Sequence, residues 1–296
     1  MLPADNGQMR AKLFRLPRHE EEGLSAAFND EVQNFVDREP KSFDPGYKRE
    51  RDEVYTIDPF SLPEFLTYAA GNWHSCGDIR RGEVKPQAVK AIVGVAGEGM
   101  RTGTPPIVEI AAFKALDRSK VFESSRRVLE WNQETFVRRT NPSLVVPDGV
   151  DAVYDNGTLF FNTFRTTNAF LDLTNQFQVL TNEAIEDVLG DVPWLSYQDE
   201  QVPFEKVLNQ TNRRLFSLIQ ATEGFAELEL ELIKARADEI GFPLQTSGEG
   251  EDETISLPST TGNMKNHLEF LLQRFYPGIF DGRLRRTNSS EIFRGP

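Results

Sequence analysis

The chain has 296 residues, 39% of them hydrophobic, and a formal net charge of −13, which predicts a globular protein with one large domain or two ordinary ones. Cys76 is the only cysteine, which excludes an intrachain disulfide, and three histidines leave little material for a zinc site. No apolar run reaches the roughly 20 residues that cross a bilayer, and residues 1–18 lack the apolar centre of a secretory signal, so we expect a cytoplasmic protein.

The first half of the chain predicts strands with two helices between them. Apolar residues at three- and four-residue steps indicate an amphipathic helix over 20–36, and Ser61 and Pro63 indicate the start of a short helix. The expected strands are 11–16, 52–58, 88–95, 107–116 and 143–146.

The stretch 150–164 predicts a β-hairpin at the centre of the chain. Asn156 and Gly157 stand between two strand-like runs, and a two-residue turn needs the backbone angles that Asn and Gly tolerate. Phe160, Phe161 and Phe164 are too apolar for catalysis, so we expect the hairpin to be a structural hub joining two halves.

The second half of the chain predicts mainly helices. The expected ranges are 166–173, 182–189, 203–221, 225–240 and 263–275. Residues 204–219 carry an apolar stripe at helical spacing, and Arg213 and Arg214 lie off that stripe. The fold class that follows is α+β, with a mixed sheet in the N-terminal and central part and a mainly helical C-terminal half. We expect regions 1–145 and 146–296, which could also form one continuous domain.

The charge is unevenly distributed. Residues 183–256 carry 17 acidic and 5 basic side chains, nearly the whole negative excess. Residues 118–139 (6 basic, 3 acidic) and 274–296 (5 basic, 2 acidic) form two islands of net +3. The overall acidity argues against indiscriminate nucleic-acid binding, whereas the islands are compatible with a local anion-binding surface. Solvated charges that cluster only in sequence are the simpler alternative.

The sequence predicts no catalytic residue, metal site or cofactor. His74 and Cys76 lack the surroundings of a cysteine-protease motif, and Gly97-Glu98-Gly99 lacks the remainder of a phosphate-binding loop. Asp78, Glu83 and Lys85 imitate the carboxylates and lysine of a metal-dependent nuclease, but their spacing is short. DNA contacts are instead expected from the two basic islands, and their candidate residues are Arg126, Arg127, Arg138, Arg139, Arg283, Arg285 and Arg286.

The order of several segments resembles a known family. These segments are DEVYTID followed by LPEFL, KAIVGVA, PPIVEIAAFKAL, SSRRVLEW, NGTLFFNTF, HLEFLLQRF and GRLRRTNSSEIF. Together they are similar to the KwaB proteins of the Kiwa anti-phage defence system, over roughly residues 12–294. The least similar part is the charged stretch 223–256.

The resemblance implies a DNA-binding effector of phage defence that works with a KwaA-like membrane protein and self-associates. It supplies no catalytic residues, so the arginines above are chosen from charge alone. Two alternatives stay open. One is a metal-dependent nuclease that uses Asp78 and Glu83, and the other is a non-catalytic oligomeric scaffold that signals through the apolar stripe 204–219.

Overall fold

The structure is a computed structural model of the chain. It describes residues 1–3, 9–11, 18–72, 88–97, 107–116, 121–122, 129–132, 135–138, 143–144, 146, 149–277 and 284–286. The chain divides into two compact units. Unit 1 comprises Met1–Phe43 and Arg49–Leu173, and unit 2 comprises Asp44–Lys48 and Thr174–Pro296. The structural division therefore follows Leu173, whereas the boundary expected at 145/146 falls inside unit 1, and residue 145 itself lies outside the described residues.

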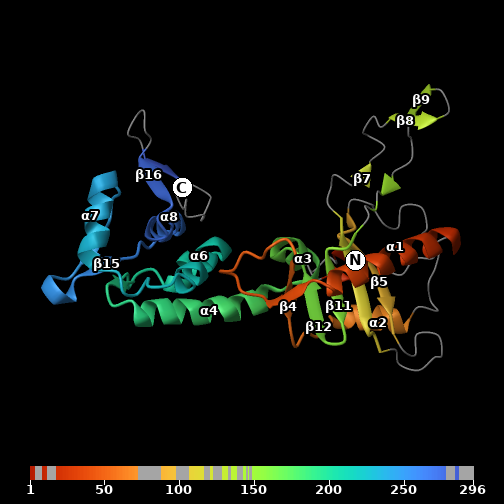
Figure 1. Ribbon diagram of the computed structural model, residues 1–296, viewed down its shortest axis with the longest axis horizontal. Helices are drawn as coiled ribbons and strands as arrows, with labels where there is room; N and C mark the ends of the chain where they lie inside the picture. The colour runs from red at the N-terminus through yellow and green to blue at the C-terminus, as the bar shows by residue number, and fades with distance from the viewer. Residues whose placement is uncertain are drawn as a thin grey trace. The chain divides into compact units, whose positions relative to one another are not determined.

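Unit 1 is built on a six-stranded mixed sheet with the strand order β3-β4-β12-β11-β6-β5 (Figure 1). The bounds of these strands are β3 (Glu39–Ser42), β4 (Glu53–Ile57), β5 (Ala91–Ala96), β6 (Ile110–Ala115), β11 (Ala152–Asp155) and β12 (Thr158–Phe161). Strands β3 and β4 pair in parallel, and every other pair in this sheet is antiparallel. The expected α+β class, with a mixed sheet in the first half and helices in the second, is confirmed.

The predicted hairpin supplies the two central strands of this sheet. Asp155 pairs with Thr158 across the turn, and Asn156 and Gly157 have φ angles of 44° and 99°. Both angles are positive, as this two-residue turn requires. The side chains of Val153 and Leu159 are fully buried. The hairpin is therefore the structural centre of unit 1.

Helices cover both faces of the sheet. Helix α1 (Arg18–Val36) places Phe28 and Phe35 in one cluster with Val54, Ala112 and Val153. On the opposite face the ring of Phe170, from α3 (Phe164–Leu171), stacks on Phe113 at 5.6 Å between centroids. The remaining elements of unit 1 are α2 (Glu64–Gly71), β1 (Leu2–Pro3), β2 (Met9–Arg10), β7 (Val121–Phe122), β8 (Leu129–Asn132), β9 (Thr135–Arg138) and β10 (Ser143–Leu144).

Unit 2 is mainly helical. Its helices are α4 (Thr174–Asp191), α5 (Phe204–Val207), α6 (Gln210–Gln220), α7 (Leu230–Ile240) and α8 (Thr261–Leu271), with the 3₁₀ turn η4 (Gly250–Asp252). Its short strands are β13 (Leu195–Ser196), β14 (Thr246–Ser247), β15 (Thr254–Ser256), β16 (Phe275–Pro277) and β17 (Leu284–Arg286). The core of this unit forms where α4, α6, α7 and α8 bring together Val188, Ile219, Ile233 and Leu268.

Four predicted helices differ from the structure by an interruption or by more than two residues at one end. The expected helix 263–275 ends at Leu271, and Phe275 begins β16. The expected helix 203–221 is interrupted, because Asn209 caps α6 by accepting a hydrogen bond from the Asn212 amide at 2.8 Å. Helix α7 begins at Leu230, later than expected, and α4 begins at Thr174, eight residues earlier than expected. The expected strand at 11–16 lies largely outside the described residues.

The apolar stripe 204–219 is used inside unit 2. Val207, Leu215 and Ile219 are buried in the core of this unit. These side chains are therefore not exposed as a surface for self-association. None of the helices in the described ranges combines the length and the apolar character needed to cross a membrane.

Candidate functional site

The structure describes three of the seven candidate arginines. Arg138 lies in β9, opposite Leu129 of β8. Arg285 and Arg286 lie in β17, paired with Tyr276 and Phe275 of β16. The other candidates, Arg126, Arg127, Arg139 and Arg283, lie outside the described residues. So do His74, Cys76, Asp78, Glu83 and Lys85, on which the thiol and nuclease interpretations depended.

Arg286 contacts a buried carboxylate. Its Nη1 atom lies 2.9 Å from Oε2 of Glu269, which is on α8. The Glu269 side chain is 6% exposed and that of Arg286 is 39% exposed. Lys265 lies one helical turn before Glu269, and its Nζ atom is 4.0 Å from Oε1. A buried carboxylate needs partners of this kind, because removing its charge from water carries a large free-energy cost.

The end of α8 places a second arginine beside Glu269. The Gln273 amide donates to the Phe270 carbonyl (2.8 Å), and the Arg274 amide donates to the Glu269 carbonyl (2.9 Å). These two bonds, with Gln273 in the left-handed region at φ 55°, form a Schellman motif. This motif turns the chain back, so that Arg274 lies next to the carboxylate that precedes it by five residues.

Arg274 interacts electrostatically with several neighbouring charges. Burial lowers its pKa from the ordinary value, Arg214 and Arg286 lower it further, and Glu269 opposes that shift. Its Nε atom is buried and has no hydrogen-bond partner. An arginine remains protonated under these conditions. The guanidinium therefore contributes a positive charge whose hydrogen-bonding capacity the protein does not fully use.

Arg214, on α6, is the last charged residue of this group, and its charge acts on Arg274. Its side chain is exposed, and its Nε atom donates to the Pro45 carbonyl at 3.2 Å. Pro45 lies in a segment that packs tightly on α6, since a Cβ atom added to Gly46 would come within 2.5 Å of the Ser217 carbonyl oxygen. We call Lys265, Glu269, Arg274, Arg286 and Arg214 the Glu269 cluster. It contains four cations and one carboxylate, so its formal charge is +3.

Two arginines in unit 1, Arg38 and Arg49, differ from those of the Glu269 cluster because they stabilise the fold through hydrogen bonds. Arg49 donates from Nε to the Asn162 carbonyl (2.8 Å) and from Nη1 to the carbonyls of Glu50 and Glu53 (2.9 Å each). Arg38 donates to the Asn162 side chain at 2.9 Å. These hydrogen bonds hold the segment after the hairpin against β4, and they use the arginines within the fold.

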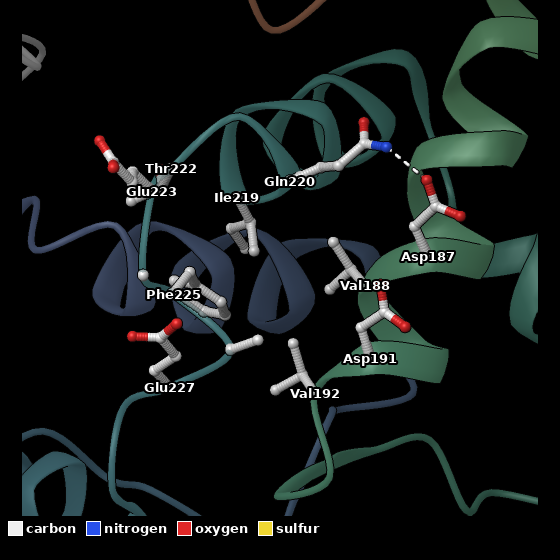
Figure 2. A pocket seen from close by; sticks show the side chains of 12 residues that line it. Asp187, Val188, Asp191, Val192, Ile219, Gln220, Thr222, Glu223, Phe225 and Glu227 are labelled. Carbon is white, nitrogen blue, oxygen red and sulfur yellow. Dashed lines mark hydrogen bonds between the residues drawn. The ribbon is translucent and has the colours of Figure 1, made fainter.

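Unit 2 also has a pocket with acidic side chains at its rim (Figure 2). Its volume is about 270 Å³, and its floor contains Ile219 and Phe225. Asp187 and Asp191 lie on α4, and the Gln220 side chain donates to Asp187 (Figure 2). Across the described ranges, no three His, Cys, Asp or Glu side chains are arranged to hold a metal ion. The pocket therefore offers negative charge without a metal-binding geometry.

Sequence reasoning identified Arg285 and Arg286 but missed Lys265, Arg274 and Arg214. A glutamate among apolar residues in HLEFLLQRF was the available signal, because Lys265 and Glu269 have the i,i+4 spacing of a helical ion pair. No local pattern connects Arg214 to the tail, because Arg214 on α6 and Arg286 on β17 come near the same residue, Arg274, only in the folded unit.

Searches with protein-family models, with curated proteins and with solved structures find no match to this chain.

Proposed function

We propose that this protein binds DNA and that the Glu269 cluster is part of the contact surface. The observation that carries the proposal is a group of four cations in a unit whose sequence is otherwise strongly acidic. Three of them, Lys265, Arg274 and Arg286, neighbour one buried carboxylate, and the fourth, Arg214, neighbours Arg274. Arginine suits phosphate because its planar guanidinium presents several donors. Arg285, on the same strand as Arg286, adds a further exposed cation to this region.

The acidic surroundings restrict how a polyanion approaches. A duplex that contacts the cluster gains counterion release there but meets repulsion from the rest of unit 2. If about three phosphates are contacted, the slope of log K against log salt is about −2.7, and affinity falls roughly 40-fold between 50 and 200 mM salt. We therefore propose weak, localised and strongly salt-dependent binding.

The biological setting is proposed from the resemblance to KwaB proteins. In that setting the chain is an effector of anti-phage defence that works beside a KwaA-like membrane protein and self-associates. DNA contact through the cluster gives this effector a physical means of responding to invading DNA.

The test is duplex DNA binding, measured by fluorescence anisotropy across a salt series. Arg214→Ala and Arg285→Ala should each weaken binding and reduce the magnitude of the salt slope by about 0.9 per lost phosphate contact. Arg236→Ala is the matched control, because Arg236 is an exposed arginine of unit 2 that pairs with Glu239 on α7. No binding by the wild type at 50 mM salt, or equal losses in all three variants, would refute the proposal.

A further inference from the structure

Strand β5 forms one edge of the six-stranded sheet, and within the described residues no other strand pairs with its outer side. Along β5, successive residues direct their main-chain N–H and C=O groups alternately toward β6 and away from it. The Leu116 amide donates to the Lys90 carbonyl at 2.8 Å, so Lys90 and every second residue after it face β6. Gly94 therefore directs its main-chain groups toward its partner Ala112 on β6, whereas Val93 and Val95 direct theirs outward. In the described part of the chain, no hydrogen bond reaches these outward groups.

The N-terminal residue already uses the first position on this edge. The Met1 amino group donates to the Ala91 carbonyl at 2.7 Å, and the Lys90 amide donates to the Met1 carbonyl at 2.9 Å. The outward side of β5 therefore accepts main-chain partners in this fold. The positions of Val93 and Val95, further along the strand, offer two donors and two acceptors with the spacing of an extended backbone.

A groove of about 410 Å³ lies between this edge and α1. Leu24, Phe28 and Val32 line it from the helix, and Ile92 lines it from β5. The helix passes close above the strand, because a Cβ atom added to Gly94 would lie 3.0 Å from the Phe28 ring. Alternate side chains of a strand added beside β5 point toward the helix side of the sheet, and the groove provides apolar space for them.

The composition of the edge also favours a partner. Exposed edge strands are usually protected by charges or prolines, and the sequence AIVGVA contains neither. Val95 is 37% exposed. The helix beside the groove carries five acidic residues and one arginine, so its field favours a basic partner.

We propose that the β5 edge binds an extended segment of a partner protein by strand addition. The segment contributes alternating apolar side chains to the groove under α1, and lysine or arginine residues flank them. The proposal rests on unit 1 alone and is independent of DNA binding.

A second copy of this chain fits the edge less well. Two β5 strands paired antiparallel, about a two-fold axis perpendicular to the sheet, would place both α1 helices on the same face of the sheet. Neighbouring strands are about 4.8 Å apart, whereas packed helices need about 8–10 Å between their axes. Each α1 passes close over its own Gly94, so the two helices would compete for the same space. A bare extended segment avoids this conflict.

The first experiment uses the labelled heptapeptide Lys-Thr-Val-Thr-Val-Thr-Lys, with blocked ends, and the wild-type protein. In the added strand the valines point toward α1, and the threonine amides point toward β5. N-methylation of two of the three threonine amides, those opposite Val93 and Val95, should reduce affinity about 25-fold or more, since each main-chain hydrogen bond corresponds to about fivefold. N-methylation of the two valine amides, which point away from β5, should leave affinity within about twofold.

The second experiment changes the protein. Val95→Pro removes one outward amide while Gly94 and Ala96 keep their pairing with β6, and proline is tolerated on an edge strand. It should weaken peptide binding about fivefold, and Val95→Ala, which retains the amide, is its control.

Equal effects of the two N-methylated peptides, or no binding of the unmodified peptide at millimolar concentration, would overturn the proposal whether or not the variants fold. Wild-type dimers that dissociate in Val95→Pro but not in Val95→Ala, measured by sedimentation velocity, would assign the edge to a second copy and also overturn it.

Discussion

Replacing Glu269 by glutamine should change the stability of the fold and its affinity for DNA in opposite directions. Glu269 is the only carboxylate of the Glu269 cluster, and it accepts the 2.9 Å hydrogen bond from Arg286. Its charge stabilises three neighbouring cations in the folded protein. The same charge weakens the attraction of the cluster for phosphate.

The stability change follows from the contact with Arg286. Hydrogen bonds to charged groups contribute about 1.5–3 kcal/mol. Arg286 is 39% exposed, so solvent screening reduces this contribution, and the amide of glutamine can still accept a weaker bond. We therefore expect Glu269→Gln to lower the free energy of unfolding by about 1–2 kcal/mol.

The affinity change follows from Coulomb's law. For a phosphate about 6 Å from the carboxylate, in surroundings close to water, removing the repulsion contributes about 0.7 kcal/mol, which is roughly threefold in affinity. This gain should shrink as salt rises, because the cluster lies at the surface.

The assay combines urea denaturation with DNA anisotropy at 50 mM salt. Arg286→Ala should lower both stability and affinity, because it removes a cation and leaves the buried carboxylate with fewer partners. Glu239→Gln makes the same charge change on α7, where the carboxylate is 65% exposed, and should alter both quantities little. The reasoning is wrong if Glu269→Gln binds DNA no more tightly than Glu239→Gln.

Three further predictions concern the fold. Asn209→Ala should lower the free energy of unfolding, measured by urea denaturation, by about 1 kcal/mol, because it removes the 2.8 Å capping hydrogen bond of α6. Thr260→Ala removes a longer capping bond of 3.4 Å on α8 and should lower it less. The reverse order of the two variants would contradict this prediction. Gly157→Ala should cost about 1 kcal/mol through backbone strain at φ 99°, since no atom lies within 4 Å of the added methyl; a cost near zero would refute it. Burial lowers the pKa of His267, so the unfolded chain takes up a proton first as the pH falls through about 6.5, and stability should decrease below that pH. The decrease in thermal midpoint between pH 7 and 5 should be smaller in His267→Phe, and equal decreases would exclude His267 as a contributor.

Local sequence determined the central hairpin and the helical character of the second half. Asn156-Gly157 specifies a two-residue turn through the backbone preferences of two adjacent residues, and the strands beside it alternate apolar side chains. Apolar spacing likewise identified α1 and α8, because an amphipathic helix carries its own pattern. These features depend on neighbours in sequence, so the chain alone specifies them.

The bounds of several helices were decided by tertiary contacts. Asn209 ends a continuous apolar pattern because the buried Asn212 side chain donates to the Val207 carbonyl at 2.7 Å and to the Thr261 carbonyl at 3.1 Å. Thr261 is far from Asn209 and Asn212 in sequence, so no local pattern predicts the interruption of this helix. The open edge at β5 also depends on the order of the strands, which pairing across the whole of unit 1 determines.

The candidate site lies between these two cases. The sequence alone marked the basic tail with Arg285 and Arg286. Only the folded unit brings Arg286 and Arg274 beside Glu269 and Arg214 near Arg274, because β17, the end of α8 and α6 are separated along the chain. Charge is a property of each residue and can be counted from the sequence. The electrostatic field that a ligand meets depends on the distances between charges. The tertiary structure decides these distances.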